Sequence, residues 1–322
     1  MVSGESSQVL QRGIELEHRM VLERDRIGDV SAADHAVSHS KRVLMIAYYF
    51  PPANNIGALR SLKFAKYLPS YGWIPYVLAP RSIANQPQDA SLLEELPDSV
   101  QVYRTWHLDP DVIRRCLLVI WTTLWKARLR RLAHKLQPGK VIRWLLLPDN
   151  RLGWLLPGYV RALRLIKDHE VDIVYTTSSP VTSHVIGLLI KQSLGLPWVA
   201  DFRDPWTGNF YAAYPTQVHS AINHLLEREV LSQADAVVSV TDTITDDLAA
   251  LVPDAPSDKF VTIMNGYDRE DFVGSQLSPY SPDGCFRLSY VGTIHGKKTA
   301  RFLLSAFSSL IEEGCLDPAK VK

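Results

Sequence analysis

Three charged side chains stand close together near the end of a short apolar run. The run, residues 198–201, is expected to form a buried strand, and it leads into the sequence DFRDPW, which contains Asp201, Arg203 and Asp204. A carboxylate near a sugar hydroxyl acts as a general base, and a neighbouring cation restrains its charge. An Arg–Asp brace that only supports the fold is the alternative. We predict these three residues as catalytic and the neighbouring Trp206 as a substrate contact.

A second candidate loop follows the apolar run at residues 42–47. It passes through a double proline to Gly57 and Arg60, which are expected in the first turn of a helix. Amides at a helix N-terminus have no helical partner, so a phosphate can bind there and glycine lets it come close. An ordinary loop with a helix-starting glycine is the alternative, because one glycine is a weaker signal than GxGxxG. We predict Gly57 and Arg60 as substrate-binding residues.

A third candidate loop carries several hydroxyl groups after the run at residues 171–176. It contains Ser178 and Ser179, and His184 falls on the first turn of the helix expected next. Hydroxyl groups at a strand end suit hydrogen bonds to a sugar or a phosphate, and we predict these three residues as substrate-binding. The alternatives are that Ser179 caps the helix, with Pro180 as its first residue, and that His184 is an ordinary helix-surface residue.

Two glycine-bearing loops stand on either side of a linker rich in serine and proline. Asn265 and Gly266 precede the linker, and Gly292 and Thr293 follow it after another apolar run. Glycine permits a turn and lets a phosphate-bearing ligand approach the backbone. A ligand in a cleft between two domains would meet both loops, so we predict these four residues as substrate-binding.

The segments that position these loops alternate between strand and helix patterns. Strands are expected at residues 42–47, 74–79, 100–104, 171–176, 198–201, 236–240 and 260–263. Helices are expected at residues 57–71, 181–192, 218–231 and 244–251, with helical material between residues 112 and 169. This alternation predicts an α/β fold with a doubly wound, Rossmann-like parallel sheet. Ligands of such sheets bind beyond the carboxyl ends of the strands, where the candidate residues stand.

The same pattern divides the chain into segments. We expect a helical or disordered extension at residues 1–38, a first α/β domain at 39–275, a linker at 276–285 and the start of a second domain at 286–322. A strand at residues 286–291 and a helix reaching residue 313 open the second domain. We expect this second domain to be incomplete, because so short a segment cannot close a parallel sheet of its own.

Composition places the chain among globular proteins and excludes some partners. Its 322 residues are 46% hydrophobic and 21% charged, enough to bury a sizeable core. The 35 lysines and arginines nearly balance 34 acidic residues, and no recognition motif is present, so we expect no nucleic-acid partner. The three cysteines lack metal-ligand spacing, which fits a reducing cytosol. Asp109 and Asp111 resemble a metal-binding DxD, but they precede a helix as ordinary caps, so we predict no metal site.

A basic segment with interleaved tryptophans is predicted to lie on anionic lipid. Residues 112–143 contain nine lysines and arginines, no acidic residue, and Trp121 and Trp125. Each basic residue near such a surface contributes about 1 kcal/mol; a solvated basic face with its tryptophans in the core is the alternative. No apolar stretch reaches the ~20 residues that span a bilayer, and the N-terminal residues lack the apolar core of a signal peptide. We expect a cytoplasmic protein, peripheral at the inner face of the plasma membrane.

With these residues the sequence resembles the glycosyltransferases of GT-B fold, particularly the large retaining family 4, over roughly residues 42–313. The similar segments are the double proline with Gly57, DFRDPW, the strand pattern VVSV, NGYD and YVGT. The resemblance implies transfer of a sugar from a nucleotide-sugar donor to a glycan or lipid-linked acceptor, in polysaccharide or glycolipid biosynthesis. It also implies retained configuration, no bound metal or cofactor, and a donor cleft between an acceptor-side and a donor-side Rossmann-like domain.

The resemblance further implies roles for particular residues. Gly57 would approach the donor phosphate, and Arg203 and Asp204 would lie near the reacting sugar. The two glycine-bearing loops beside the linker would border the donor cleft. Many family members have a glycine pair where this chain has Ile56 followed by Gly57. The paired-glutamate helix that grips the donor in the family would lie beyond residue 322, so we expect this chain alone to have weak or no turnover.

Two other functions fit the same residues. One is a non-catalytic GT-B half-domain that binds a glycan or a protein partner. Absence of donor-dependent transfer would favour this function. The other is a GT-B sugar-nucleotide epimerase, which would convert the donor without any acceptor.

Overall fold

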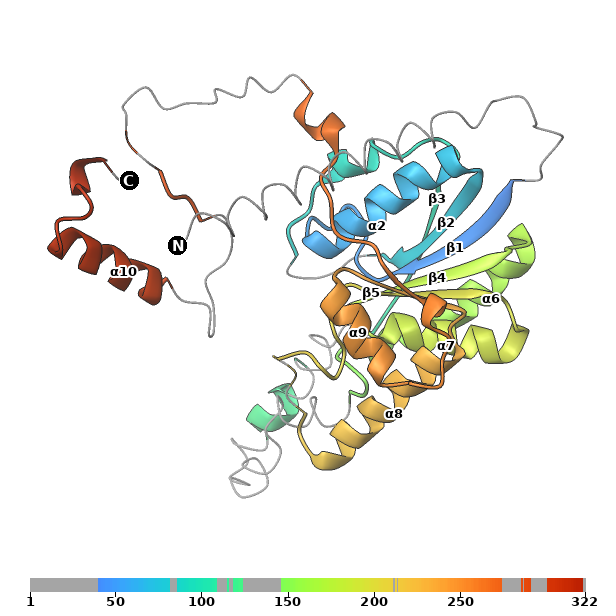
Figure 1. Cartoon of the computed structure of the whole chain (residues 1–322). Coiled ribbons are helices and arrows are strands. Elements are labelled where there is room, and N and C mark those ends of the chain that lie inside the picture. The colour runs from blue at the N-terminus through green and yellow to red at the C-terminus, as the bar shows by residue number, and fades with distance from the viewer. Residues whose placement is uncertain are drawn as a thin grey trace. The chain divides into compact units, whose positions relative to one another are not determined.

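The computed structural model (Figure 1) describes residues 40–81, 86–108, 115, 118–123, 146–210, 212, 214–273, 285, 287–290 and 300–320. The predicted extension at residues 1–38 and most of the basic segment 112–143 lie outside these residues. The chain forms two compact units, Met1–Gly266 and Tyr267–Lys322. Within the described ranges, no helix is both long enough and apolar enough to cross a bilayer.

The first unit contains a seven-stranded sheet in which every pair of neighbouring strands is parallel. Its order is β3-β2-β1-β4-β5-β6-β7. The strands are β1 Lys41–Ala47, β2 Trp73–Pro80, β3 Gln101–Thr105, β4 Ile173–Ser178, β5 Trp198–Phe202, β6 Ala236–Ser239 and β7 Phe260–Thr262. The chain moves one way from β1 to β3 and the other way from β4 to β7, so β1 and β4 meet at the switch point of a doubly wound sheet. This confirms the predicted α/β fold.

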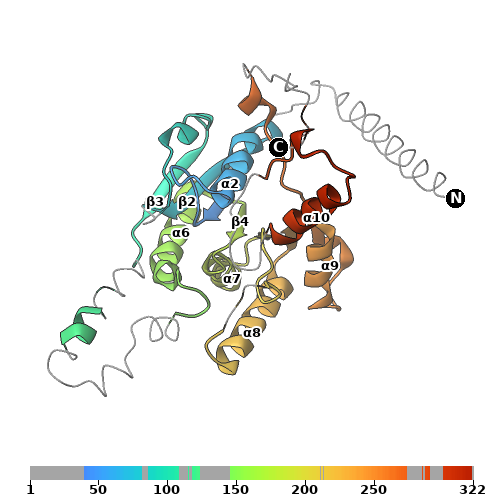
Figure 2. The ribbon, with the colours of Figure 1, turned by 90° about the vertical axis from the view of Figure 1, so that its left-hand side faces the viewer.

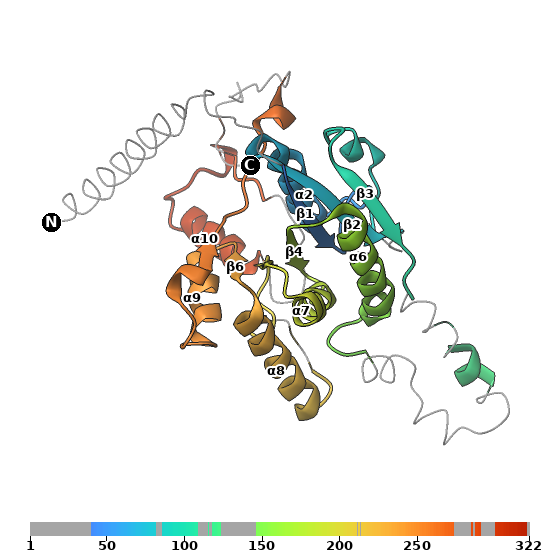
Figure 3. The ribbon, with the colours of Figure 1, turned by 90° about the vertical axis from the view of Figure 1, so that its right-hand side faces the viewer.

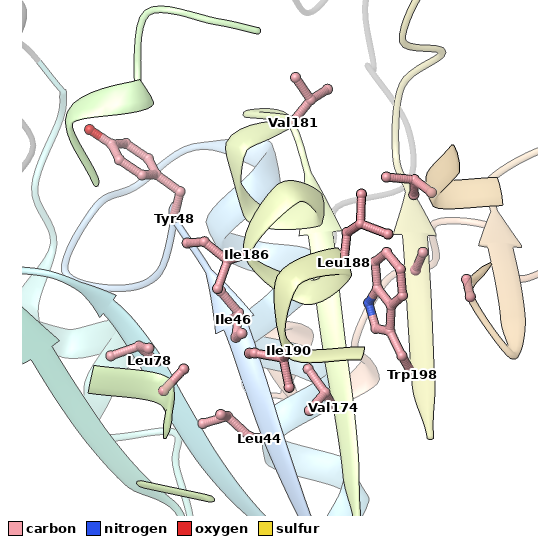
Figure 4. Packing of buried hydrophobic residues seen from close by; sticks show 14 of the residues in the cluster. Leu44, Ile46, Tyr48, Leu78, Val174, Val181, Ile186, Leu188, Ile190 and Trp198 are labelled. Atoms are coloured by element: carbon pink, nitrogen blue, oxygen red, sulfur yellow. The ribbon is translucent and has the colours of Figure 1, made fainter. Parts of the chain in front are cut away.

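The central strand β1 is buried on both faces, as expected for a parallel sheet covered on each side. Leu44 and Ile46 belong to one core cluster, whereas Val43 and Met45 belong to another, because successive side chains of a strand point to opposite faces. Figure 4 shows Leu44, Ile46 and Leu78 of the strands packed near Ile186 and Ile190 of the helix above them.

Helices cover the two faces of the sheet unequally. The helix α2 Ile56–Tyr67 lies on one side, where its Ala65 packs with Val43 and Met45. On the other side lie α6 Leu155–His169, α7 Thr182–Leu194 and α8 Gln217–Gln233 (Figures 1 and 3). The helix α9 Asp242–Ala250 joins β6 to β7. Connections between parallel strands are right-handed, so the side on which a connecting helix lies depends on the direction in which the chain moves along the sheet. That direction reverses between β1 and β4, which places the helices on both faces.

The second unit contains one of the two elements predicted for it. The expected helix is confirmed as α10 Arg301–Glu312, and the short helices η5 Arg269–Phe272 and η6 Pro318–Lys320 lie in the same unit. The predicted strand at residues 286–291 is wrong for residues 287–290, which are exposed and without regular structure. The physical reason is that no other strand occurs in the described part of this unit, so a strand there would have no ladder partner.

Candidate functional site

The candidate residues converge beyond the carboxyl ends of β1, β4 and β5. These three strands are neighbours in the sheet, so the loops that follow them lie side by side. The loop after β1 leads to Gly57, the loop after β4 contains Ser179, and the loop after β5 contains Arg203. This edge of the sheet includes the switch point, where open parallel sheets bind their ligands.

The guanidinium group of Arg203 joins the three loops. Its Nη2 donates a hydrogen bond to the Ser179 carbonyl at 3.0 Å, and its Nε lies 3.7 Å from the Asp204 carboxylate. The Arg203 side chain is 11% exposed, whereas that of Asp204 is 49% exposed. The sheet edge therefore presents a carboxylate that a ligand can reach, beside a cation that the protein holds in place.

Gly57 is explained by its contact with Arg203 rather than by a phosphate. A Cβ atom built on Gly57 would lie 2.0 Å from Nη1 of Arg203, so only glycine leaves room for the guanidinium. One of the amides that would receive an anion is also occupied, because the Asn55 side chain accepts from the Ala58 amide at 2.9 Å as the N-cap of α2. Direct approach of a donor phosphate to Gly57 therefore has less support than its role beside Arg203.

Asp201 is a positioning residue in this geometry, which corrects its catalytic assignment. The side chain is fully buried, and one oxygen accepts from Nη2 of Arg60 at 2.7 Å. The other oxygen accepts from the Tyr175 hydroxyl at 2.8 Å and the Thr177 hydroxyl at 2.7 Å. With both oxygens bonded to protein donors, Asp201 offers no acceptor to a sugar hydroxyl.

Arg60 connects the buried Asp201 to Asn265, which is exposed. Arg60 is 8% exposed, and its Nη1 donates to the Asn265 side chain at 3.0 Å. Burial alone lowers the pKa of Arg60, but the hydrogen bond and charge of Asp201 outweigh burial, so the pKa of Arg60 is raised. Arg60 therefore connects α2 to β5 instead of pointing to a ligand. Gly266 follows Asn265 in an exposed segment, with no atom within 4 Å of its would-be Cβ.

Trp206, predicted as a substrate contact, joins the loop after β5 to α8. It is 5% exposed, and its indole nitrogen donates to the Asn223 side chain at 2.8 Å. The next residue, Thr207, donates from its amide and its hydroxyl to the buried Glu227 carboxylate, and burial raises the pKa of Glu227. Neither α8 residue was predicted from the sequence, because a helical Asn and Glu resemble ordinary surface positions.

The hydroxyl-rich loop after β4 does not have the form of the alternative interpretation, in which Ser179 caps the helix. The helix α7 begins at Thr182, and its first amide is capped by the partly buried Asp149 carboxylate, which accepts from the Thr182 amide at 2.9 Å and hydroxyl at 2.8 Å. Ser179 therefore does not cap the helix, and its carbonyl binds Arg203 instead. Ser178 is 1% exposed, and its hydroxyl has no partner among the residues that the structure describes.

His184 is a core residue, which corrects its assignment as a substrate contact. Its side chain is fully buried, its Nδ1 lies 2.7 Å from the Thr176 hydroxyl, and its ring centroid lies 4.4 Å from that of Phe202. Burial lowers the pKa of His184 from 6.5 to about 3. The imidazole is therefore neutral and inaccessible to a ligand.

The depressed pKa of His184 predicts that acid destabilises the fold. Below pH 6.5 the His184 imidazole binds a proton in the unfolded chain but stays neutral in the folded protein. The free energy of unfolding therefore decreases as the pH falls from 6.5 toward 3. The loss from this one group between pH 7.5 and pH 5 is expected to be about 2 kcal/mol. Urea unfolding of wild type and His184→Gln at both pH values measures it. An equal pH dependence in the two proteins would show that His184 makes no such contribution.

Two predicted substrate contacts, Gly292 and Thr293, lie outside the described residues, as do Asp109 and Asp111. The described site therefore consists of Gly57, Ser179, Arg203 and Asp204, all from the first unit.

Comparisons with known proteins give a family and a fold. The glycosyl transferase 4-like domain matches residues 77–266. A sucrose-phosphate synthase from Thermosynechococcus elongatus is similar in structure, with a TM-score of 0.53 and 14% identity over 84% of this chain and 60% of that chain. The Anabaena protein HepE, in complex with UDP-glucose, has a TM-score of 0.45 and 13% identity over 87% of this chain and 59% of its own. No curated protein sequence matches the chain.

Proposed function

This chain belongs to the glycosyl transferase 4-like domain family, and on that premise we propose that it acts in transfer of a sugar from a nucleotide-sugar donor. The acceptor in this proposal is a glycan or a lipid-linked glycan of polysaccharide or glycolipid biosynthesis, met at the cytoplasmic face of the membrane. Because the chain spans 60% of the similar sucrose-phosphate synthase, the activity of the whole protein is part of the proposal.

The observation that carries the proposal is the Arg203–Asp204 pair, which follows β5 next to the switch point of the sheet. A fixed guanidinium stabilises negative charge that develops on a leaving diphosphate, with no need for a metal ion. The neighbouring Asp204 carboxylate is half exposed, so an acceptor hydroxyl can reach it. The buried Arg60–Asp201 pair and the Trp206–Asn223 bond hold the strand and the loop that carry them.

These positions divide the chemistry between the two side chains. In the proposed step, the bond from the anomeric carbon to the diphosphate oxygen breaks and a bond to the acceptor oxygen forms. The acceptor proton passes to Asp204, and Arg203 stabilises the charge left on the diphosphate. We propose retention of the anomeric configuration, with the acceptor attacking the anomeric carbon from the same face that the diphosphate leaves, and with no bound cofactor.

The test is turnover of nucleotide sugars by the protein encoded by the full reading frame that contains this chain. Release of nucleoside diphosphate is followed across UDP-, GDP- and ADP-sugars, and the anomeric configuration of the product is read by NMR. Donor-dependent transfer with retention supports the proposal. Conversion of a donor to its epimer without acceptor would indicate the epimerase instead, and no reaction with any donor would favour a non-catalytic binding domain.

A further inference from the structure

A separate pocket with a basic lining lies at the β3 end of the sheet. It has a volume of about 600 Å³ and is lined by Arg81, Arg104, Thr105, Trp106, Leu156, Pro157, Val160, Arg161 and Arg164. Four of these residues are arginines and none is acidic. The pocket lies between the ends of β2 and β3 and the helix α6, which lies beside those strands in Figure 2. It shares no residue with the Arg203 site.

The arginines of this pocket fall into two groups. Two are held by the protein: Arg104 donates to the carbonyls of Pro80 and Pro51, and Arg161 lies 5.2 Å from the centroid of the Tyr103 ring. By contrast, the guanidinium groups of Arg81 and Arg164 make no hydrogen bond or ion pair with any residue that the structure describes. Four cations around one hollow repel one another unless an anion lies between them.

Apart from the buried Thr105, the rest of the lining is apolar, and three of its side chains are open to solvent. Trp106 is 63% exposed, Leu156 is 69% exposed and Val160 is 39% exposed. Exposed apolar side chains that cluster around a polar hollow are typical of binding sites. A tryptophan and two aliphatic side chains suit the hydrocarbon or ring part of a ligand whose charged group meets the arginines.

We propose that this pocket binds the phosphate or diphosphate group of the acceptor, with the adjoining apolar part of the acceptor on Trp106, Leu156 and Val160. Arginine suits phosphate because its planar fork donates parallel hydrogen bonds to two oxygens. The pocket opens at the carboxyl edge of the sheet, the same edge as the Arg203 site. That the ligand is the acceptor rests on the proposed function; that the pocket binds a phosphate does not.

The test is calorimetric titration of the chain with inorganic pyrophosphate and with geranyl diphosphate, in the absence of donor. Wild type is expected to bind both, and geranyl diphosphate more tightly. The double variant Arg81→Gln/Arg164→Gln is expected to weaken both at least about tenfold, because charge-assisted hydrogen bonds are lost. Arg228→Gln, the same change at an exposed position of α8, is the matched control and is expected to bind as wild type does.

Trp106→Ala separates a lipid-linked phosphate from a free one. This variant is expected to lower the affinity for geranyl diphosphate and to leave the affinity for pyrophosphate unchanged. If wild type bound both ligands equally tightly and Trp106→Ala changed neither affinity, the apolar part of the proposal would be overturned. Affinity in the double variant equal to that of wild type, or an equal loss in Arg228→Gln, would overturn the phosphate site. Arg81→Lys/Arg164→Lys keeps the charge without the planar fork and is expected to recover part of the binding; urea unfolding of both double variants checks that they are folded. The titration contains no donor, so absence of sugar transfer in the other experiment would not affect the phosphate-binding result. Sugar transfer by a protein that does not bind phosphate here would overturn the proposal for this pocket and leave the proposed function standing.

Discussion

Replacing Arg60 by methionine is expected to lower the free energy of unfolding by about 3–5 kcal/mol. The side chains of Arg60 and Asp201 are 5% and 0% exposed, so the change leaves a carboxylate in the core without its countercharge. Methionine fills a similar volume, and the loss therefore comes from the charge more than from a cavity. Urea unfolding at pH 7 measures the difference.

Two further variants isolate the cause of that loss. Adding Asp201→Asn to Arg60→Met is expected to recover part of the stability, since the buried charge is then removed. Lys191→Met breaks the more exposed pair with Asp235 and is expected to cost no more than about 1 kcal/mol. If Arg60→Met cost no more than Lys191→Met, the buried pair would not be what joins α2 to β5.

Replacing Gly57 by alanine is expected to reduce turnover about 100-fold while the fold is retained. The new methyl group would meet the guanidinium of Arg203, whose flexible side chain can move away at little cost. Alanine also suits a helix better than glycine by about 0.5–1 kcal/mol, so the free energy of unfolding is expected to stay within about 1 kcal/mol of wild type. Nucleotide-sugar turnover and urea unfolding of the same preparation give both quantities.

The mechanism of this loss is tested by removing the group that is displaced. In an Arg203→Ala background, Gly57→Ala is expected to have no further effect on turnover, because the two changes act on one guanidinium. Gly208→Ala is the matched control, since its Cβ would only touch Pro205 at 3.6 Å. A Gly57→Ala protein with full turnover would show that Arg203 need not occupy its present position.

The order of strands and helices could be predicted from sequence because its signals are local. Residues 43–47, for example, are apolar and are followed by a double proline at residues 51 and 52, and each expected strand of the first unit is present. The strand at residues 286–291 was the exception. Its apolar pattern is that of a strand, but strand formation depends on a neighbour, and a local pattern contains no information about that neighbour.

The candidate site was predicted less well because its contacts join distant segments. The sequence predicted Arg203 and Asp204 as site residues because they follow a strand directly, and the structure places them at that strand end. It placed Asp201 with them, whereas the pleat turns Asp201 toward Arg60 of α2, 141 residues away. The cap of α7 comes from Asp149, 33 residues before Thr182, and no local rule predicts it over Ser179. Trp206 was predicted as a substrate contact, and its hydrogen bond to Asn223, 17 residues away on α8, has no local signal in the sequence.

The most direct test of the central claim is nucleotide-sugar turnover by Asp204→Ala in the protein expressed from the full reading frame. Asp246→Ala, the same change at an exposed position of α9, is the control. Loss of the carboxylate that receives the acceptor proton is expected to reduce turnover about 100-fold, with Asp246→Ala equal to wild type. Turnover by Asp204→Ala equal to that of the control would contradict the assignment of the reaction to the loop after β5.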